Sequence, residues 1–122
     1  MNNKSANHAR RQANLKGHFA EYYAAFYLIL KGYRIVNMRY KTKLGEIDII
    51  ARKRDLAIFI EVKARDDLQK GVDAVSYQSQ TRIKNASDLW LLKQKNPQLI
   101  SQRYDIIVVR PLRWPIHFLD AF

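Results

Sequence analysis

Two carboxylates and a lysine lie close together in the middle of the sequence and could act on phosphate esters. The stretch from Gly45 to Lys63 reads Gly-Glu-Ile-Asp-Ile-Ile and, after a basic turn, Phe-Ile-Glu-Val-Lys. Its acids include Asp48 and Glu61, and Lys63 follows Glu61 at a spacing of two. Carboxylate oxygens suit a divalent cation, and a nearby lysine supplies fixed positive charge where negative charge develops. We interpret the stretch as a metal-dependent phosphodiesterase site.

Two adjacent strands would position these side chains. Alternating and β-branched residues predict strands at 46–52 and 56–64, joined by a short polar turn. A hairpin centred on that turn places Asp48 directly opposite Glu61, and two facing carboxylates repel each other unless a cation lies between them. The alternative is a solvated sheet face on which basic neighbours such as Lys63 neutralise Glu61.

The same alternation sorts the side chains of the first of these strands. It puts Glu46 and Asp48 on one face, with Ile47 and Ile49 on the other. The acidic and apolar faces are therefore expected to be separate.

The remaining patterns predict an α/β domain around the hairpin. A first helix is expected from about residue 8 to Gly32, where glycine favours a stop. The later elements, in chain order, are strands at 33–40, 46–52 and 56–64, a helix at 76–95, and strands at 104–109 and 116–119. Ser76 or Ser79 could cap the second helix, and a polar loop is expected at 65–73.

The first helix carries large apolar residues at three- and four-residue spacing, which predicts a stripe facing the core. These residues are Leu15, Phe19, Tyr22, Phe26, Ile29 and Leu30. Glu21 lies off this stripe beside Gly17, Ala24 and Ala25, so another element or a ligand could approach its carboxylate. An ordinary solvated helix glutamate is the alternative.

The charge of the chain favours a polyanionic partner. Its 122 residues include 22 Lys+Arg and 11 Asp+Glu, a net charge of +11, and such an excess drives binding to phosphate. Nucleic acid is the leading candidate; an anionic membrane surface and a basic protein without a ligand are the alternatives. The candidate nucleic-acid contacts are Lys41, Lys43, Arg65, Arg82 and Lys84, and a merely solvated basic face is the alternative for the last two.

Composition and motifs weaken several other classes. The chain has no cysteine, which fits a reducing cytoplasm, and no apolar run approaches the roughly 18 residues of a membrane span. His8, His18 and His117 show no zinc-site spacing, and Asp105 is expected to be structural. We expect one soluble cytoplasmic domain over residues 1–122, with residues 1–8 as a disordered tail.

The order of the elements and the placement of the acids resemble the PD-(D/E)xK, or restriction-endonuclease-like, nuclease superfamily. The segments Gly45–Ala51 and Phe59–Arg65, preceded by Gly17–Glu21 and Gly32-Tyr33, resemble more closely the YraN family of small bacterial proteins, predicted nucleases related to Holliday-junction resolvases. The resemblance implies a restriction-endonuclease-like core of α-β-β-β-α-β order, with a mixed central sheet flanked by helices.

The resemblance also implies roles for individual residues. Glu21, Asp48, Glu61 and Lys63 would be catalytic, and Asp48 and Glu61 would bind Mg²⁺ or Mn²⁺. Glu21 would help directly or through water, and Lys63 would orient or activate the attacking water.

Three functions follow as hypotheses. The first is a metal-dependent endonuclease acting on DNA, including branched or junction DNA. The second is a nucleic-acid-binding module that keeps the nuclease fold without catalysis. The third is an adaptor whose basic surface meets an acidic protein. The sequence also leaves a homodimer open.

Overall fold

The computed structural model describes the backbone of residues 3–65 and 75–122, and the side chains of residues 17–65 and 75–122. It contains α1 (Asn3–Leu30), β1 (Arg34–Lys41), β2 (Glu46–Lys53), β3 (Leu56–Ala64), α3 (Tyr77–Leu92), the 3-10 helix η1 (Pro97–Leu99), β4 (Ser101–Val109) and β5 (Ile116–Phe118). The loop expected at 65–73 lies outside the described residues beyond Arg65. No helix in the described ranges is long and apolar enough to span a membrane.

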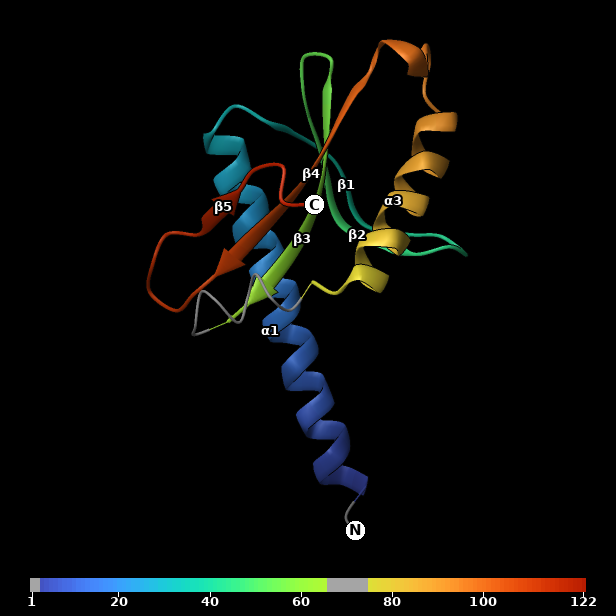
Figure 1. Cartoon of the computed structure of the whole chain (residues 1–122). Helices are drawn as coiled ribbons and strands as arrows, with labels where there is room; N and C mark the ends of the chain where they lie inside the picture. The colour runs from blue at the N-terminus through green and yellow to red at the C-terminus, as the bar shows by residue number, and fades with distance from the viewer. Residues whose placement is uncertain (1–2, 66–74) are drawn as a thin grey trace.

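The strands form one mixed sheet with a helix packed on each face (Figure 1). Its order is β1-β2-β3-β4-β5, with β3 and β4 parallel and every other neighbouring pair antiparallel. The long connection through α3 permits the one parallel pair, since a tight turn cannot join parallel strands. The predicted α-β-β-β-α-β order and the mixed sheet flanked by helices are confirmed, and the strand predicted at 116–119 is β5, at one edge of the sheet.

The helix boundaries differ in detail from the prediction. The hydroxyl of Ser76 caps α3 by accepting a hydrogen bond from the Ser79 amide at 3.1 Å, so the first of the two predicted caps is the one used. α1 begins at Asn3, whereas the sequence predicted a start near residue 8 after a disordered tail.

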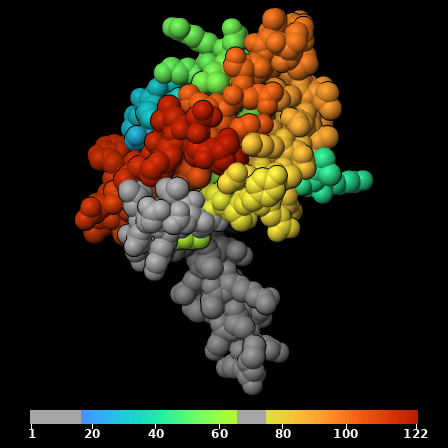
Figure 2. Space-filling view, viewed as in Figure 1, coloured from blue at the N-terminus to red at the C-terminus, as the bar shows by residue number. Residues whose placement is uncertain are grey.

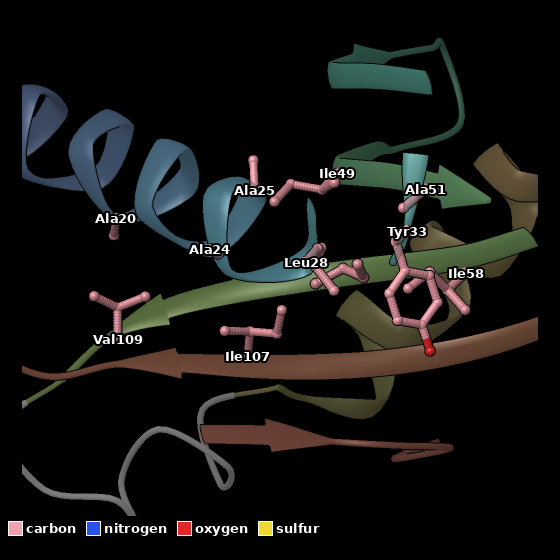
Figure 3. Close-up of a cluster of buried hydrophobic side chains, with 11 residues drawn as sticks. Ala20, Ala24, Ala25, Leu28, Tyr33, Ile49, Ala51, Ile58, Ile107 and Val109 are labelled. Carbon is pink, nitrogen blue, oxygen red and sulfur yellow. The ribbon is translucent and has the colours of Figure 1, made fainter. Parts of the chain in front are cut away.

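α1 packs on the sheet through its alanines and Leu28. Ala20, Ala24 and Leu28 are buried against Ile49 and Ile107 of the sheet (Figure 3). The large residues of the predicted stripe face outward: Phe19, Tyr22, Phe26, Ile29 and Leu30 are each between 55% and 68% exposed. The predicted core-facing stripe is therefore wrong, and the side chain of its first member, Leu15, lies outside the described residues.

The physical reason is the volume already occupied by the sheet. Its α1 face carries isoleucine and valine side chains, so alanines on the helix fill the remaining space at native density without overpacking.

α3 covers the opposite face with a second core. Ile47 and Ile50 of β2 lie there with Trp90 of α3, whereas Ile49 lies in the α1 core. The prediction that Ile47 and Ile49 share a face is therefore wrong. The alternation of β2 is interrupted at Asp48, the residue beyond the last paired position of β2 and β3.

Candidate acidic site

The register of the β2–β3 hairpin brings Asp48 toward Glu61. Paired residues run from Lys53↔Leu56 to Ile49↔Ile60, which is the predicted register. At the next position the pairing ends, and Asp48 Oδ2 instead accepts a hydrogen bond from the Val62 amide at 2.8 Å. The two strands diverge from there (Figure 1), so the carboxylate of Asp48 lies in a fork between them.

The fork opens into a hollow of about 160 Å³, here called the acidic hollow. It is lined by Glu46, Asp48, Glu61, Ser79, Arg82 and Ile83. The strands thus contribute three carboxylates, and the first turns of α3 contribute a hydroxyl and a guanidinium. Glu46 and Ser79 were not among the predicted site residues. The signal for Glu46 was its position two residues before Asp48 on the same strand; Ser79 had no signal beyond its place in the first turn of a helix.

Lys63 lies beside Glu61 in the same region. Its Nζ is 3.1 Å from Glu61 Oε1, and the two side chains are only 21% and 17% exposed. This is the ion pair that the alternative interpretation of the hairpin expected. It also places a lysine ammonium next to the fork, because the charge of Lys63 acts on Asp48 as well as on Glu61.

Asp48 is held in an environment that opposes its ionisation. Burial raises the pKa of its carboxyl group, the nearby negative charge of Glu61 raises it further, and the Val62 amide and Lys63 offset only part of this, so that the pKa is about 7. The fork therefore resists carrying both negative charges at neutral pH unless positive charge is added to it.

Glu21 approaches this region without joining the hollow. Its Oε2 lies 3.3 Å from Nη1 of Arg39, and its side chain is 13% exposed. Burial raises the pKa of Glu21 despite the attraction of Arg39, and the negative charge of Glu61 contributes to the rise. Glu21 thus acts on the other acids through its charge, while its contact is with Arg39 of β1.

Of the five predicted nucleic-acid contacts, only Arg82 lines the acidic hollow. Lys41 and Lys43 line a separate hollow of about 410 Å³, together with Lys93 at the C-terminal cap of α3. Lys84 lies over the rings of Tyr104 and Phe122, with its Nζ 5.5 Å and 5.9 Å from the ring centroids.

The last of the five, Arg65, is exposed at the end of β3. It donates a hydrogen bond to the Ala64 carbonyl at 2.8 Å.

Gly45 fixes the position of the strand relative to α3. A Cβ atom at this position would collide with the backbone oxygen of Arg82, so only glycine allows this approach. The turn before it is held by the Thr42 hydroxyl, which accepts hydrogen bonds from the amides of Leu44 and Gly45. This contact brings the start of β2 against the first turns of α3 and so assembles the acidic hollow.

The donor set fits a hard divalent cation. Within the described residues, Val62 uses one oxygen of Asp48 and Lys63 uses one oxygen of Glu61, which leaves the second oxygen of each carboxylate for a cation. No group of three or more His, Cys, Asp or Glu side chains in the described ranges is arranged to hold a metal. Mg²⁺ is commonly bound by one or two carboxylates, with water and substrate phosphate completing its ligands.

Comparisons with known proteins give a consistent result. The family described as "Uncharacterised protein family UPF0102" matches residues 20–109. Similar proteins include a UPF0102 protein of Rhizobium johnstonii, 58% identical over 113 residues that cover 93% of each chain. A UPF0102 protein of Agrobacterium fabrum is 57% identical, also over 113 residues that cover 93% of each chain. One of Rhizobium etli is 55% identical over the full length of both chains.

Proposed function

The chain belongs to the UPF0102 family, which is the YraN family that its sequence resembles. From the residues of its acidic hollow, we propose that it is a metal-dependent nuclease that hydrolyses DNA phosphodiester bonds. One observation carries the proposal: Asp48 and Glu61 meet Arg82 in one hollow, with Lys63 against Glu61. Paired acids with a fixed cation beside them are suited to phosphoryl chemistry.

We propose that Asp48 and Glu61 bind Mg²⁺ or Mn²⁺ through their remaining oxygens. The raised pKa of Asp48 supports this, because an added cation removes the repulsion between the two carboxylates. Bound there, the cation would supply Lewis-acid stabilisation of the phosphate and a nucleophile at neutral pH.

The side chains of the hollow would have distinct tasks. Lys63, freed from part of its interaction with Glu61, would orient the attacking water and offset charge on the phosphate. The Arg82 guanidinium at the rim can contact a neighbouring phosphate with two N–H groups. Glu21 would tune the electrostatics of the acids from its pair with Arg39.

DNA is the proposed substrate because the net charge of +11 favours a polyanion. Branched or junction DNA enters the proposal through the family resemblance, since junction resolvases are related to that family.

The experiment compares cleavage of linear, nicked and four-way-junction DNA in Mg²⁺ or Mn²⁺. Asp48→Asn keeps the shape of the side chain but weakens metal binding, and Lys63→Ala removes the fixed cation. Each should lower the cleavage rate by roughly a hundredfold or more.

Matched controls come from α3 and the turn after it. Asp88→Asn and Lys95→Ala change exposed residues and should leave the rate unchanged. Cleavage that survives Asp48→Asn and Lys63→Ala would come from a contaminating nuclease and would reject the assignment.

The Lys63–Glu61 ion pair favours a second candidate, a nucleic-acid-binding module without catalysis. In that case Lys63 already neutralises Glu61, and the ion pair has a structural role that needs no metal cation. Asp48→Asn would then leave DNA affinity unchanged or improve it, because a negative charge near phosphate is removed, and no protein of the series would cleave DNA.

A further inference from the structure

A second hollow lies at the other end of β2 and is lined almost entirely by cations. It has a volume of about 450 Å³ and is lined by Gly32, Arg34, Arg52, Lys53 and Arg54; we call it the basic hollow. It adjoins the tip of the β2–β3 hairpin, which projects at the top of the molecule in Figures 1 and 2. None of its lining residues was among the predicted nucleic-acid contacts.

The cations of this hollow are not neutralised within the described part of the chain. None of its four basic side chains lies within an ion-pair distance of a described carboxylate. Arg34 and Arg52 are direct partners in the β1–β2 register, and like charges at such positions destabilise a sheet. A bound anion would relieve this repulsion.

Arg52 also carries an unsatisfied donor. Its Nη2 donates to the Arg54 carbonyl at 3.2 Å, which holds the guanidinium toward the turn. Its Nε is buried and has no hydrogen-bond partner among the described residues. A buried N–H without a partner is costly, and an anion that drew the guanidinium outward would give this N–H an acceptor.

Lys53 has a separate task in the same place. Its Nζ donates to the Lys31 carbonyl at 3.3 Å, at the C-terminal end of α1, and lies 5.2 Å from the centroid of the Tyr33 ring. It therefore offsets the partial negative charge of the helix end, which would otherwise repel an anion. The arginines remain for the ligand, and their planar guanidinium groups match phosphate oxygens in pairs.

β1 and β2 connect this hollow to the acidic one. At one end Arg34 is paired with Arg52, and at the other Lys41 is paired with Glu46 of the acidic hollow. Arg52 follows Asp48 by four residues on β2, a separation of about 13 Å along the strand. That length corresponds to about four base pairs of a duplex.

We propose that the basic hollow is a second phosphate-binding site, which holds the backbone of the same nucleic acid a few base pairs from the acidic hollow. The inference rests on the proposed function for its ligand class. Arg34 and Arg54 would contact phosphates, and Arg52 would complete the site from the sheet.

The test measures the affinity of a fluorescein-labelled 24-base-pair duplex by fluorescence anisotropy at several salt concentrations. The double variant Arg34→Gln/Arg54→Gln changes two exposed side chains. The slope of its log affinity against log salt concentration should be smaller in magnitude than that of the wild type by about 1 to 2. The ratio of wild-type to variant affinity should therefore fall roughly tenfold between 50 and 200 mM salt. Circular dichroism melting confirms that the variant is folded.

The matched control is Lys95→Gln/Arg113→Gln, which removes the same charge from exposed positions elsewhere and should keep the wild-type slope. An unchanged slope for the Arg34/Arg54 variant overturns the inference. The inference is also overturned if the Arg34/Arg54 variant keeps the wild-type DNA affinity but is no longer stabilised against heat by millimolar inorganic phosphate. The hollow would then bind free phosphate.

Cleavage in the same samples separates this inference from the proposed function. If the protein cleaves DNA, the Arg34/Arg54 variant should keep the rate at saturating DNA and need more DNA to reach it. If the Arg34/Arg54 variant has the smaller salt slope but neither it nor the wild type cleaves DNA, the nuclease proposal is rejected and the second phosphate-binding site is supported.

Discussion

Asp105 and Asp48 show how the surroundings of an aspartate determine whether it suits a structural or a chemical role. Asp105 is fully buried, and both of its oxygens accept hydrogen bonds: from Arg103 at 2.8 and 2.9 Å, from His117 Nε2 at 2.7 Å and from the Asp120 amide at 2.9 Å. The structural role expected for Asp105 agrees with this network. Asp48 has one backbone donor and a neighbouring carboxylate, an arrangement typical of functional sites.

The pKa values of these two carboxyl groups move in opposite directions, because the balance between burial and hydrogen bonding differs at the two sites. Burial alone would raise the pKa of Asp105, but the hydrogen bonds from His117, Arg103 and the Asp120 amide outweigh it and hold the pKa at about 2. At Asp48 the donors are too few to reverse the effect of burial, so its pKa rises.

Asp105 should make the stability of the protein depend on pH at the acidic end. Its pKa is about 2 in the folded protein against an ordinary 3.8, so the ionised form favours folding above about pH 4. This contribution, on the order of 2 kcal/mol, should disappear as the pH falls from about 4 to about 2. Urea unfolding at a series of pH values measures it.

Asp105→Asn is the informative variant for this prediction. It should destabilise the protein at pH 7 by about 3–5 kcal/mol, because Arg103 and His117 lose a buried charge partner. The difference in the free energy of unfolding between this variant and the wild type should decrease by about 2 kcal/mol near pH 2. A gap that stays constant with pH would contradict the argument, and Asp88→Asn, at an exposed position, should show little effect at any pH.

At the scale of elements, the acidic hollow depends on how closely the β1–β2 turn approaches α3. Gly45 lies against the backbone of Arg82, and this contact joins the strand that carries Glu46 and Asp48 to the helix that carries Arg82. The glycine of the Gly-Glu-Ile-Asp motif is therefore explained by packing.

Gly45→Ala should destabilise the protein by about 1–3 kcal/mol, because its Cβ meets backbone that cannot rotate away. The same substitution should lower DNA cleavage by displacing Arg82 from the acids. Gly17→Ala is the matched control: a Cβ there meets no atom within 4 Å, and alanine in a helix is favoured by about 0.5–1 kcal/mol. Equal melting temperatures for Gly45→Ala and the wild type would show that the turn does not need glycine.

At the scale of the whole molecule, metal binding should stabilise the fold. A cation that binds only the folded protein at a concentration of about 100 times its dissociation constant adds about 2.7 kcal/mol, which for a domain of this size raises the melting temperature by about 10 °C. Differential scanning fluorimetry with Mn²⁺, and again after chelation, measures the shift.

The variants report on the origin of that stabilisation. Asp48→Asn should abolish the Mn²⁺ shift and keep or raise the melting temperature without metal, because the repulsion from Glu61 is gone. Asp88→Asn should keep the shift. A shift that persists in Asp48→Asn would place the cation elsewhere.

The order of the elements, the register of the β2–β3 hairpin and the closeness of Asp48 to Glu61 could be predicted from the amino-acid sequence. These follow from local information: periodicity identifies each strand, and a short turn between strands fixes which residues face each other. The bounds of β3 and the cap of α3 were predictable for the same reason.

Packing between distant segments sets which face of α1 is buried and which residues of α3 line the acidic hollow. The large apolar residues of α1 are as hydrophobic as a core stripe requires, but the space above a sheet of isoleucines and valines is filled by the face that carries Ala20, Ala24 and Leu28. Likewise, Arg82 lines the same hollow as Asp48, and Lys84 does not, because the close approach at Gly45 sets the position of α3. Contacts between distant segments leave no periodic pattern, so the sequence could not show them.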